Sequence, residues 1–465
     1  MERSYLIAIS RSRRTIARPE TRIRTVLSAV LLTLLIPGAA RAASGDLDLS
    51  FGQGGYAAVQ TNRACLRGCV EFGGSYAEAL ALQPDGGIVL GGYNSYIGAA
   101  RVSEEVPGAL VRLRPNGTLD TSFGGSGGIV DTPFQVTEIH ANAQGGLRVS
   151  GDGEQGFGVQ RYTSTGTLDG FYGTHGVRWL PRFEGQRDRA GRAYMFTTFL
   201  VPATDYAPAV EKTAITRLLP SGEQDMSFGH HGYLSLPQGD VAGALALQQD
   251  GSVLLTFATE RGVQAPELKP RRLYLERLTP RGQPDRTFGR HGVVRVPLKG
   301  SVGSSTIVST HGGEVRIVGS EQRGGIFGDY YLFQAAYAQT GRLDREFGQG
   351  GVTHSRMSHG PQYDGVSPLA ITFDASRDMI VAGRLGIRTV DTPAGDGFLA
   401  RFTPHGRDCS FGVGGVVINE RMGAANAVAL QPDGRIVVAG WGGGFLAARY
   451  MGGGRPHACA GEPTR

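Results

Sequence analysis

Apolar and polar residues alternate along this chain in short runs of about five, and Gly or Pro separates most of the runs. The clearest unit is a pair of runs joined by Pro-Asp-Gly, as in residues 79–92 and 427–440. Alternation with a period of two predicts β-strands, and Pro-Asp-Gly predicts a tight turn between them. We therefore expect a β-hairpin at each of these places.

Two further apolar runs follow each hairpin. Residues 109–113 and 398–402 are examples of the third run, and residues 128–130 and 415–417 are examples of the fourth. A turn with an aromatic residue and Gly precedes the fourth run, and a helical pattern is almost absent. Each unit therefore predicts four antiparallel strands, and the chain as a whole predicts an all-β fold.

The turn before the fourth strand has the pattern Asp-x-x-(Phe/Tyr)-Gly-x-x-Gly, which occurs seven times at intervals averaging about 60 residues. Four strands per repeat and seven repeats are typical of a β-propeller. A solenoid would need distinct end repeats to cover its open edges, and none is evident. We predict a seven-bladed β-propeller over residues 43–450. Its turn aromatics are Phe51, Phe123, Tyr172, Phe228, Phe288, Phe347 and Phe411.

The two ends of the repeat array predict how the ring closes. The first repeat begins at its own turn, residues 48–51, and the seventh stops at Arg449-Tyr450. With four strands counted in the last repeat, we expect no strand exchange at closure, so that neither terminus lends a strand to a blade at the other end.

Three sequence patterns that the repeats of this chain follow approximately, LDxSFGxxG, ALQPDGxIVVAG and ARLxPxGxLD, resemble the delta-60 repeat family of bacterial exported proteins. The resemblance covers residues 45–450. It implies a repeat architecture and export from the cell. The family has no general catalytic signature, so the resemblance implies no reaction.

Residues 1–42 have the pattern of an export signal. A basic stretch precedes the apolar run 26–36, which is too short to span a bilayer, and Ala40-Arg41-Ala42 is a small-x-small cleavage pattern. We expect cleavage after Ala42 and a secreted or periplasmic protein, in which residues 451–465 form a C-terminal tail. Arg13-Arg14 leaves a twin-arginine export route open as an alternative to an ordinary leader.

The leader also explains the positive charge of the chain. Of 47 Lys and Arg, eight lie in residues 1–42, and of 41 Asp and Glu, two lie there, which leaves 39 of each sign. A balanced mature chain has no general attraction for phosphate backbones, so we expect no nucleic-acid partner. No later run reaches the 18 or so apolar residues of a membrane helix, so we expect no membrane span. We also expect the protein to be a monomer.

All four cysteines lie after the leader, and an even number in an exported chain favours disulfides. Cys65 and Cys69 are four residues apart, which leaves Cys409 and Cys459 as the natural second pair, although the other connectivities stay open. That second bond would pin the tail over the seventh blade. A metal site is the alternative for the closely spaced pair, but no second pair of zinc-finger type completes it.

The repeated Asp of the turn pattern has a structural explanation. Asp before a tight turn accepts backbone N–H groups, and an Arg closes the preceding strand in six of the seven copies, so a recurring ion pair is expected. A row of calcium-binding carboxylates is the alternative. The Asp residues are Asp48, Asp120, Asp169, Asp225, Asp285, Asp344 and Asp408, and the Arg residues are Arg112, Arg161, Arg217, Arg277, Arg401 and Arg449.

Three consecutive repeats have His immediately before the last Gly of the turn: His175, His231 and His291. Equivalent loops lie on one face of a propeller, and we expect these three to lead into its innermost strands, so these side chains are the candidate metal ligands. The alternative is conformational. Three of the other four copies have Gly there, which indicates a left-handed backbone that His tolerates.

The chain contains none of the common hydrolase, zinc-protease or phosphate-binding motifs, so we assign no catalytic residue and no cofactor. The first functional hypothesis is an exported, noncatalytic binding or scaffold module, with a protein or a polysaccharide as its ligand. Inserted segments at 60–76, 260–272 and 385–396 would give it specificity. The alternative is an exported hydrolase or lyase with its site at the mouth of the central channel.

Overall fold

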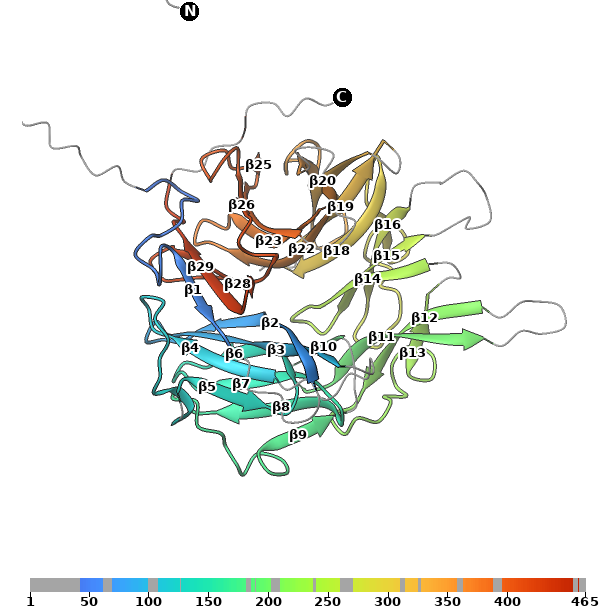
Figure 1. The fold of residues 1–465 in the computed structure, drawn as a ribbon. Helices are drawn as coiled ribbons and strands as arrows, with labels where there is room; N and C mark the ends of the chain where they lie inside the picture. Colours follow the sequence, from blue (N-terminus) through green and yellow to red (C-terminus); the bar gives the residue numbers. More distant parts are fainter. Residues whose placement is uncertain are drawn as a thin grey trace, which may run out of the picture. The chain divides into compact units, whose positions relative to one another are not determined.

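The computed structural model describes residues 42–465 as one compact unit, with gaps. Residues 1–41 lie outside the description, as do residues 62–68, 99–107, 126, 181–184, 189, 202–209, 237–239, 260–270, 310–313, 325–327, 358–362, 388–394, 455–458 and 460–465. The described residues form seven antiparallel sheets arranged in a ring, which are the blades of a β-propeller (Figure 1).

The strands of each blade, in spatial order, are as follows. Blade 1 contains β2 (Cys69–Leu82), β3 (Ile88–Gly98), β4 (Gly108–Leu113) and β5 (Ile129–Thr132). Blade 2 contains β6 (Gln135–Ala141), β7 (Leu147–Gly153), β8 (Gly156–Tyr162) and β9 (Val177–Leu180). Blade 3 contains β10 (Gly185–Arg187), β11 (Ala193–Val201), β12 (Val210–Leu218) and β13 (Tyr233–Ser235). Blade 4 contains β14 (Asp240–Leu247), β15 (Val253–Thr259), β16 (Arg272–Leu278) and β17 (Val293–Arg295).

Blade 5 contains β18 (Ser301–Ser309), β19 (Val315–Arg323), β20 (Asp329–Tyr337) and β21 (Val352–Arg356). Blade 6 contains β22 (Tyr363–Phe373), β23 (Met379–Ile387) and β24 (Gly395–Thr403), and both β25 (Gly406–Arg407) and β26 (Val416–Asn419) pair with β24. Blade 7 contains β27 (Ala424–Leu430), β28 (Ile436–Trp441), β29 (Phe445–Tyr450) and β1 (Tyr56–Val59). One 3-10 turn, η1 (Phe123–Gly125), lies between β4 and β5.

The predicted seven blades of four antiparallel strands are therefore confirmed, but the predicted closure without strand exchange is wrong. Strand β1, near the N-terminus, pairs with β29 and completes the last blade, with Tyr56 opposite Ala448 and Val59 opposite Phe445. The physical reason is the register of the repeat. The chain enters at the turn before a fourth strand, so β1 is that fourth strand, while the last repeat ends after its third. Pairing the two satisfies the open edge of β29.

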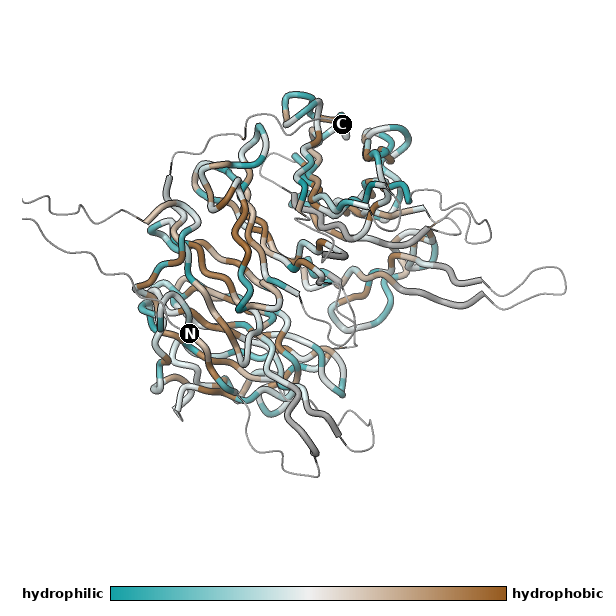
Figure 2. Tube along the Cα trace, turned by 45° about the horizontal axis from the view of Figure 1, so that its top comes forward, coloured by the Kyte–Doolittle hydropathy of each residue, from teal (hydrophilic) through white to brown (hydrophobic). Residues whose placement is uncertain are grey.

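The first strand of each blade lies nearest the centre of the ring, and the fourth strand lies at its periphery, as β1, β5, β9 and β13 show in Figure 1. Strand β2 contacts both β6 and β27, and β18 contacts both β14 and β22, so neighbouring first strands touch one another. Apolar residues are concentrated in the strands and polar residues in the turns (Figure 2). This distribution buries apolar surface between successive blades, which is the main stabilising contribution.

Among the side chains that the structure describes, those between blades 2 and 3 form the smallest buried apolar cluster. This cluster has three buried members, Phe157, Val159 and Ala193, whereas the clusters at the other interfaces have nine to thirteen. Blade 3 also starts with the shortest first strand, the three-residue β10. The repeat is therefore least regular where its sequence departs most from the common pattern.

Each blade has two ends. The turn between the first and second strands and the Asp-x-x-Phe turn lie at one end, which we call the motif end. The connections from the second to the third strand, and from the fourth strand to the next blade, lie at the opposite end, which we call the loop end. This arrangement follows from the antiparallel order of the strands.

No helix among the described residues is long and apolar enough to cross a membrane.

Candidate functional site

The repeated Asp residues serve the turns, as the sequence predicted. Asp225 Oδ1 accepts the backbone N–H of Ser227 at 3.0 Å and its hydroxyl at 2.6 Å, and Asp48 holds Ser50 in the same way. Burial alone would raise the pKa of Asp48, but the hydrogen bonds from Ser50 and the contact with Arg449 lower it below its usual value. The carboxylates are therefore used within their own turns.

The predicted Arg–Asp ion pair is present in five blades. Arg217 Nε lies 2.8 Å from Asp225 Oδ2, and Arg449 Nε lies 2.8 Å from Asp48 Oδ2 across the ring closure. The guanidinium also covers the aromatic ring of the turn, 4.8 Å from the centroid of Phe228 in blade 3. Removal of one partner from such a buried pair costs about 3–5 kcal/mol. The pairs are Arg112–Asp120, Arg217–Asp225, Arg277–Asp285, Arg401–Asp408 and Arg449–Asp48.

In six of the seven blades, the glycine after the turn aromatic also donates its backbone N–H to a turn of the next blade. Arg217 Nη1 donates to the carbonyl of Pro280 at 2.5 Å, and the backbone N–H of Gly229 donates to Arg281 at 2.8 Å, so the turn of blade 3 contacts a turn of blade 4. A Cβ at Gly282 would lie 2.7 Å from the ring of Phe228, so only Gly lets that ring approach. The repeated Asp, Phe, Gly and Arg residues are thus a device that holds the blades together.

Two blades lack the ion pair. In blade 5, Ala336 stands at the Arg position, and Arg316 of the neighbouring strand, which is its register partner, covers Phe347 at 4.1 Å instead. In blade 2, Arg161 stacks on Tyr172 at 4.3 Å. Stacking of a guanidinium on the turn aromatic is therefore retained where the ion pair is lost.

His175, His231 and His291 all have left-handed backbones, with φ of 53°, 53° and 56°. Their turns lead into β9, β13 and β17, which are outer strands, so the expectation that they lead into the innermost strands is wrong: the first strands line the centre. No group of three His, Cys, Asp or Glu side chains close enough to hold a metal ion occurs among the described residues. The structure does not bring the three His together, and each contributes to its own turn.

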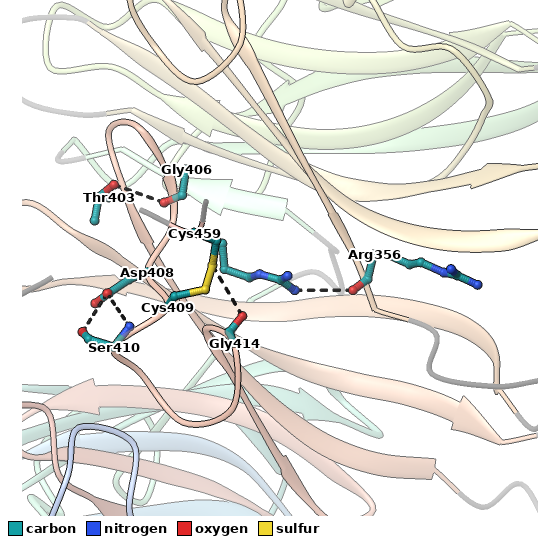
Figure 3. Close-up of a disulfide and its surroundings, with 9 residues drawn as sticks. Arg356, Thr403, Gly406, Asp408, Cys409, Ser410, Gly414 and Cys459 are labelled. Carbon is teal, nitrogen blue, oxygen red and sulfur yellow. Dashed lines mark hydrogen bonds between the residues drawn. A yellow bond between two sulfur atoms is a disulfide. The ribbon is translucent and has the colours of Figure 1, made fainter. Parts of the chain in front are cut away.

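Cys409 and Cys459 form a disulfide, with their Cα atoms 4.9 Å apart (Figure 3). The backbone N–H of Cys459 also donates to the carbonyl of Arg407 at 3.0 Å. Both contacts attach the tail to the turn of blade 6, between β24 and β26, and not over blade 7 as predicted. The pairing of Cys65 with Cys69 lies outside the described residues.

A more promising site lies at the centre of the ring, where the first strands carry β-bulges. The register of β2 skips Glu78, that of β6 skips Thr137, that of β22 skips Leu369 and that of β27 skips Asn426, while β14 and β18 skip two residues each. A bulge turns its extra side chain out of the regular alternation and is common beside binding sites. Six of the seven inner strands therefore have an irregularity, and in all of them but β18 it includes the position four residues before the last paired residue.

Two of these bulge residues meet across the closing interface between blades 7 and 1. Asn426 Nδ2 donates to Glu78 Oε1 at 3.1 Å and to the carbonyl of Ala77 at 3.1 Å. Burial raises the pKa of the Glu78 carboxyl. The pair joins a carboxylate to an amide, and both side chains are half-buried.

Three half-buried aromatic side chains lie next to this pair. Tyr76 and Tyr93 are register partners on β2 and β3, with stacked rings 5.1 Å apart and 17° from parallel. Trp441, at the end of β28 in blade 7, lies 5.5 Å from Tyr76 at 54°. Burial, and then the charge of Glu78, raise the pKa of the Tyr93 hydroxyl. We call Tyr76, Glu78, Tyr93, Asn426 and Trp441 the seam site.

Sequence comparison supports the propeller repeats. Residues 83–123 and 431–454 match a family described as a β-propeller domain of unknown function, DUF5122. These segments fall in blades 1 and 7, and the chain is a propeller repeat protein. No curated protein matches the chain.

Several solved structures are similar to this chain. A protein of unknown function from Dyadobacter fermentans is 12% identical, with a TM-score of 0.37, and the match covers 85% of this chain and 97% of that one. Drosophila Semaphorin 2a is 8% identical, with a TM-score of 0.40 and coverages of 83% and 76%. The α-L-arabinofuranosidase Arb93A of Fusarium graminearum is 9% identical, with a TM-score of 0.34 and coverages of 85% and 96%. All three TM-scores are low, so the propeller assignment rests on the strands of this chain.

Proposed function

We propose that this protein is an exported, noncatalytic binding or scaffold module of the delta-60 kind, which acts in the cell envelope or outside the cell. The observation that carries the proposal is the placement of the inserted segments on an otherwise uniform frame. The connections from β1 to β2, from β15 to β16 and from β23 to β24 all belong to the loop end. A rigid frame with its variable connections at one end is a common arrangement for recognition.

The residues at the centre of the ring favour binding over catalysis. Hydrolysis of a glycosidic bond, for example, commonly uses two carboxyl groups placed about 5–10 Å apart on either side of that bond. The hydrogen-bond partner of Glu78 is the amide of Asn426, which is neither an acid nor a base. The His residues that could act as general bases lie in the outer turns of blades 2 to 4.

Export is supported by the leader pattern and by the disulfide, which persists in an oxidising compartment. Ala43, the first residue after the proposed cleavage site, donates its N–H to Asp46 Oδ2 at 2.6 Å. Cleavage would turn this N–H into an ammonium group beside a carboxylate. Intact-mass measurement on protein from the native host should give a chain that begins at Ala43. A folded protein that keeps Met1 would remove the basis for the proposed compartment.

The binding function is tested by purifying the full chain from the envelope fraction of its native host and identifying what co-purifies. We expect a specific protein or polysaccharide to be retained by the intact protein and lost when the inserted segment 388–394 is replaced by a short Gly-Ser turn. Retention of nothing above the level of an unrelated propeller would contradict the proposal, and so would turnover of a substrate by the purified protein.

A further inference from the structure

We propose that the seam site binds a saccharide, with a sugar ring against Tyr76, Tyr93 and Trp441 and with sugar hydroxyls on Glu78 and Asn426. This inference rests on the proposed binding function and adds a place and a ligand class to it. The site lies at the loop end of blade 7, where Trp441 is the last residue of β28, and near the middle of β2, in which Tyr76 is the eighth of 14 residues.

The hydrogen-bonding atoms that the Asn426–Glu78 pair leaves available are acceptors. Both hydrogens of the Asn426 amide are used, one by Glu78 Oε1 and one by the carbonyl of Ala77. Asn426 Oδ1 and Glu78 Oε2 have no hydrogen-bond partner among the described residues. A ligand that bonds to this pair must therefore supply donors, and a sugar supplies neighbouring O–H groups that can reach two acceptors at once.

The aromatic side chains provide the complementary apolar surface. A pyranose ring has C–H groups on one face and hydroxyls around its edge, so it can lie on an aromatic ring while its edge remains hydrogen-bonded. Tyr76, Tyr93 and Trp441 are each half-buried, so part of every residue is accessible to solvent. Tyrosine and tryptophan suit such a place because they combine an apolar body with a polar group.

A quaternary ammonium ligand is the main alternative for aromatic residues next to a carboxylate. Such a cation sits within about 6 Å of the centre of each ring that encloses it. The rings of Tyr76 and Tyr93 are nearly parallel and only 5.1 Å apart, so they contact each other and leave no space for a cation between them. The pair is a surface on which a ligand can lie, not the two walls of a cage.

Buried contacts behind the seam site hold it in place. The hydroxyl of Ser75 donates to Asn94 Oδ1 at 2.7 Å, and Thr61 donates to the same oxygen at 2.5 Å, which fixes β2 against β3 one register position from the tyrosines. A Cβ at Gly423 would lie 2.2 Å from the Trp441 ring, so only glycine leaves room for the indole at this position. A site held by strands and a buried network recognises a ligand without first being ordered.

The chain offers a direct spectroscopic test, because it has two tryptophans and only one of them is in the site. Trp179 lies on β9, against Phe134. The mature Trp179→Phe protein therefore reports on Trp441 alone. We would titrate it with cellohexaose, chitohexaose, xylohexaose, maltohexaose and the polysaccharide fraction of its native envelope, and with tetramethylammonium chloride as the cationic probe. We expect a saturable shift of the emission with at least one saccharide and none with the cation.

Variants assign that signal to the site. Tyr93→Ala removes half of the stacked pair, and Glu78→Gln replaces one acceptor oxygen by a donor, so each should weaken saccharide binding at least tenfold in an assay by calorimetry. Tyr274→Ala is the matched control. It removes a tyrosine of blade 4 whose ring is stacked on Phe257 at 5.3 Å. Because the seam site lies between blades 7 and 1, this variant should leave the affinity for the saccharide unchanged. Circular dichroism verifies that each variant is folded.

Three results would overturn the inference: no emission shift with any saccharide, a shift with tetramethylammonium alone, or equal weakening by Tyr93→Ala and Tyr274→Ala. Its failure can be told apart from failure of the proposed function. If the intact protein still retains a partner from the envelope fraction, the binding function stands and the ligand or the site is a different one.

Discussion

Replacement of Phe51 by Ala tests how the ring is closed. Phe51 belongs to the N-terminal segment, is 0% exposed, and has the guanidinium of Arg449 from blade 7 4.6 Å from its ring centroid. Its ring also lies against Gly117 of blade 1, where a Cβ would come within 2.8 Å. One side chain therefore contacts both blades that meet at the closure.

The magnitude follows from the buried surface. A phenylalanine buries about 150–250 Å², which at about 25 cal/mol per Å² corresponds to roughly 4–6 kcal/mol as an upper estimate. Measured Phe→Ala changes in protein cores are about 3–5 kcal/mol. We expect Phe51→Ala to lower the free energy of unfolding by about 3–5 kcal/mol. Phe288→Ala should cost about the same, because Phe288 is also 0% exposed and lies under Arg277 at 4.8 Å.

The two variants should differ in where the protein opens. Chemical denaturation would measure the loss of stability, and hydrogen exchange would locate the opening. Phe51→Ala should increase exchange in β1 and β29, whereas Phe288→Ala should increase it in blades 4 and 5. A loss below about 1 kcal/mol for Phe51→Ala would refute the burial argument. Unchanged exchange in β1 and β29 would refute the role of Phe51 in closure.

Three further predictions concern the disulfide, a buried carboxyl and the His turns. Cys459→Ser should lower the unfolding temperature more than Cys69→Ser does, because the bond spans 50 residues and loops of that size contribute about 2–4 kcal/mol; equal effects in calorimetry would count against it. Although burial opposes it, hydrogen bonds from neighbouring side chains lower the pKa of Glu321 to about 2, so its stabilisation is complete above about pH 4.5 and is lost as the pH falls towards 2. As the pH falls through this range, the free energy of unfolding should therefore decrease less steeply for Glu321→Gln than for the unchanged protein. Parallel curves for the two proteins would contradict the assignment. His231→Gly should leave the metal content unchanged and the free energy of unfolding within about 1 kcal/mol, since Gly suits the left-handed backbone; a stoichiometric metal lost in this variant would show that His231 is a ligand.

The repeat allowed the blades and their turns to be predicted because each one is encoded locally. Alternation, the Pro-Asp-Gly turns and the spacing from Asp to Arg recur within about ten residues, so they can be found along the chain. The left-handed His residues follow from comparison with Gly at equivalent positions. The prediction of how the ring closes was wrong because closure depends on which strand has no partner at the end of the array. This can be judged only after all strands have been assigned to sheets.

The seam site could not be predicted because its members are far apart in sequence. Asn426 and Glu78 are 348 residues apart and meet only because the ring closes between blades 7 and 1. A weak signal was available: each is a polar residue between two alanines in an otherwise apolar first strand, at corresponding positions of two repeats. The bulge that takes each residue out of the regular alternation of the strand is a property of strand pairing, and the sequence does not reveal it.

The closing strand β1 has a consequence for how the protein is made. Strand β1, which completes blade 7, is synthesised before the rest of the propeller. Asp48 can form its ion pair only after Arg449, 401 residues later in the chain, has been synthesised. Contacts over such distances form late and slowly. A chain shortened anywhere before β29 leaves β1 without a partner and exposes an open strand edge at each end of the array. The ring thus closes only once β29 has been synthesised, and chains that end earlier remain open to proteases.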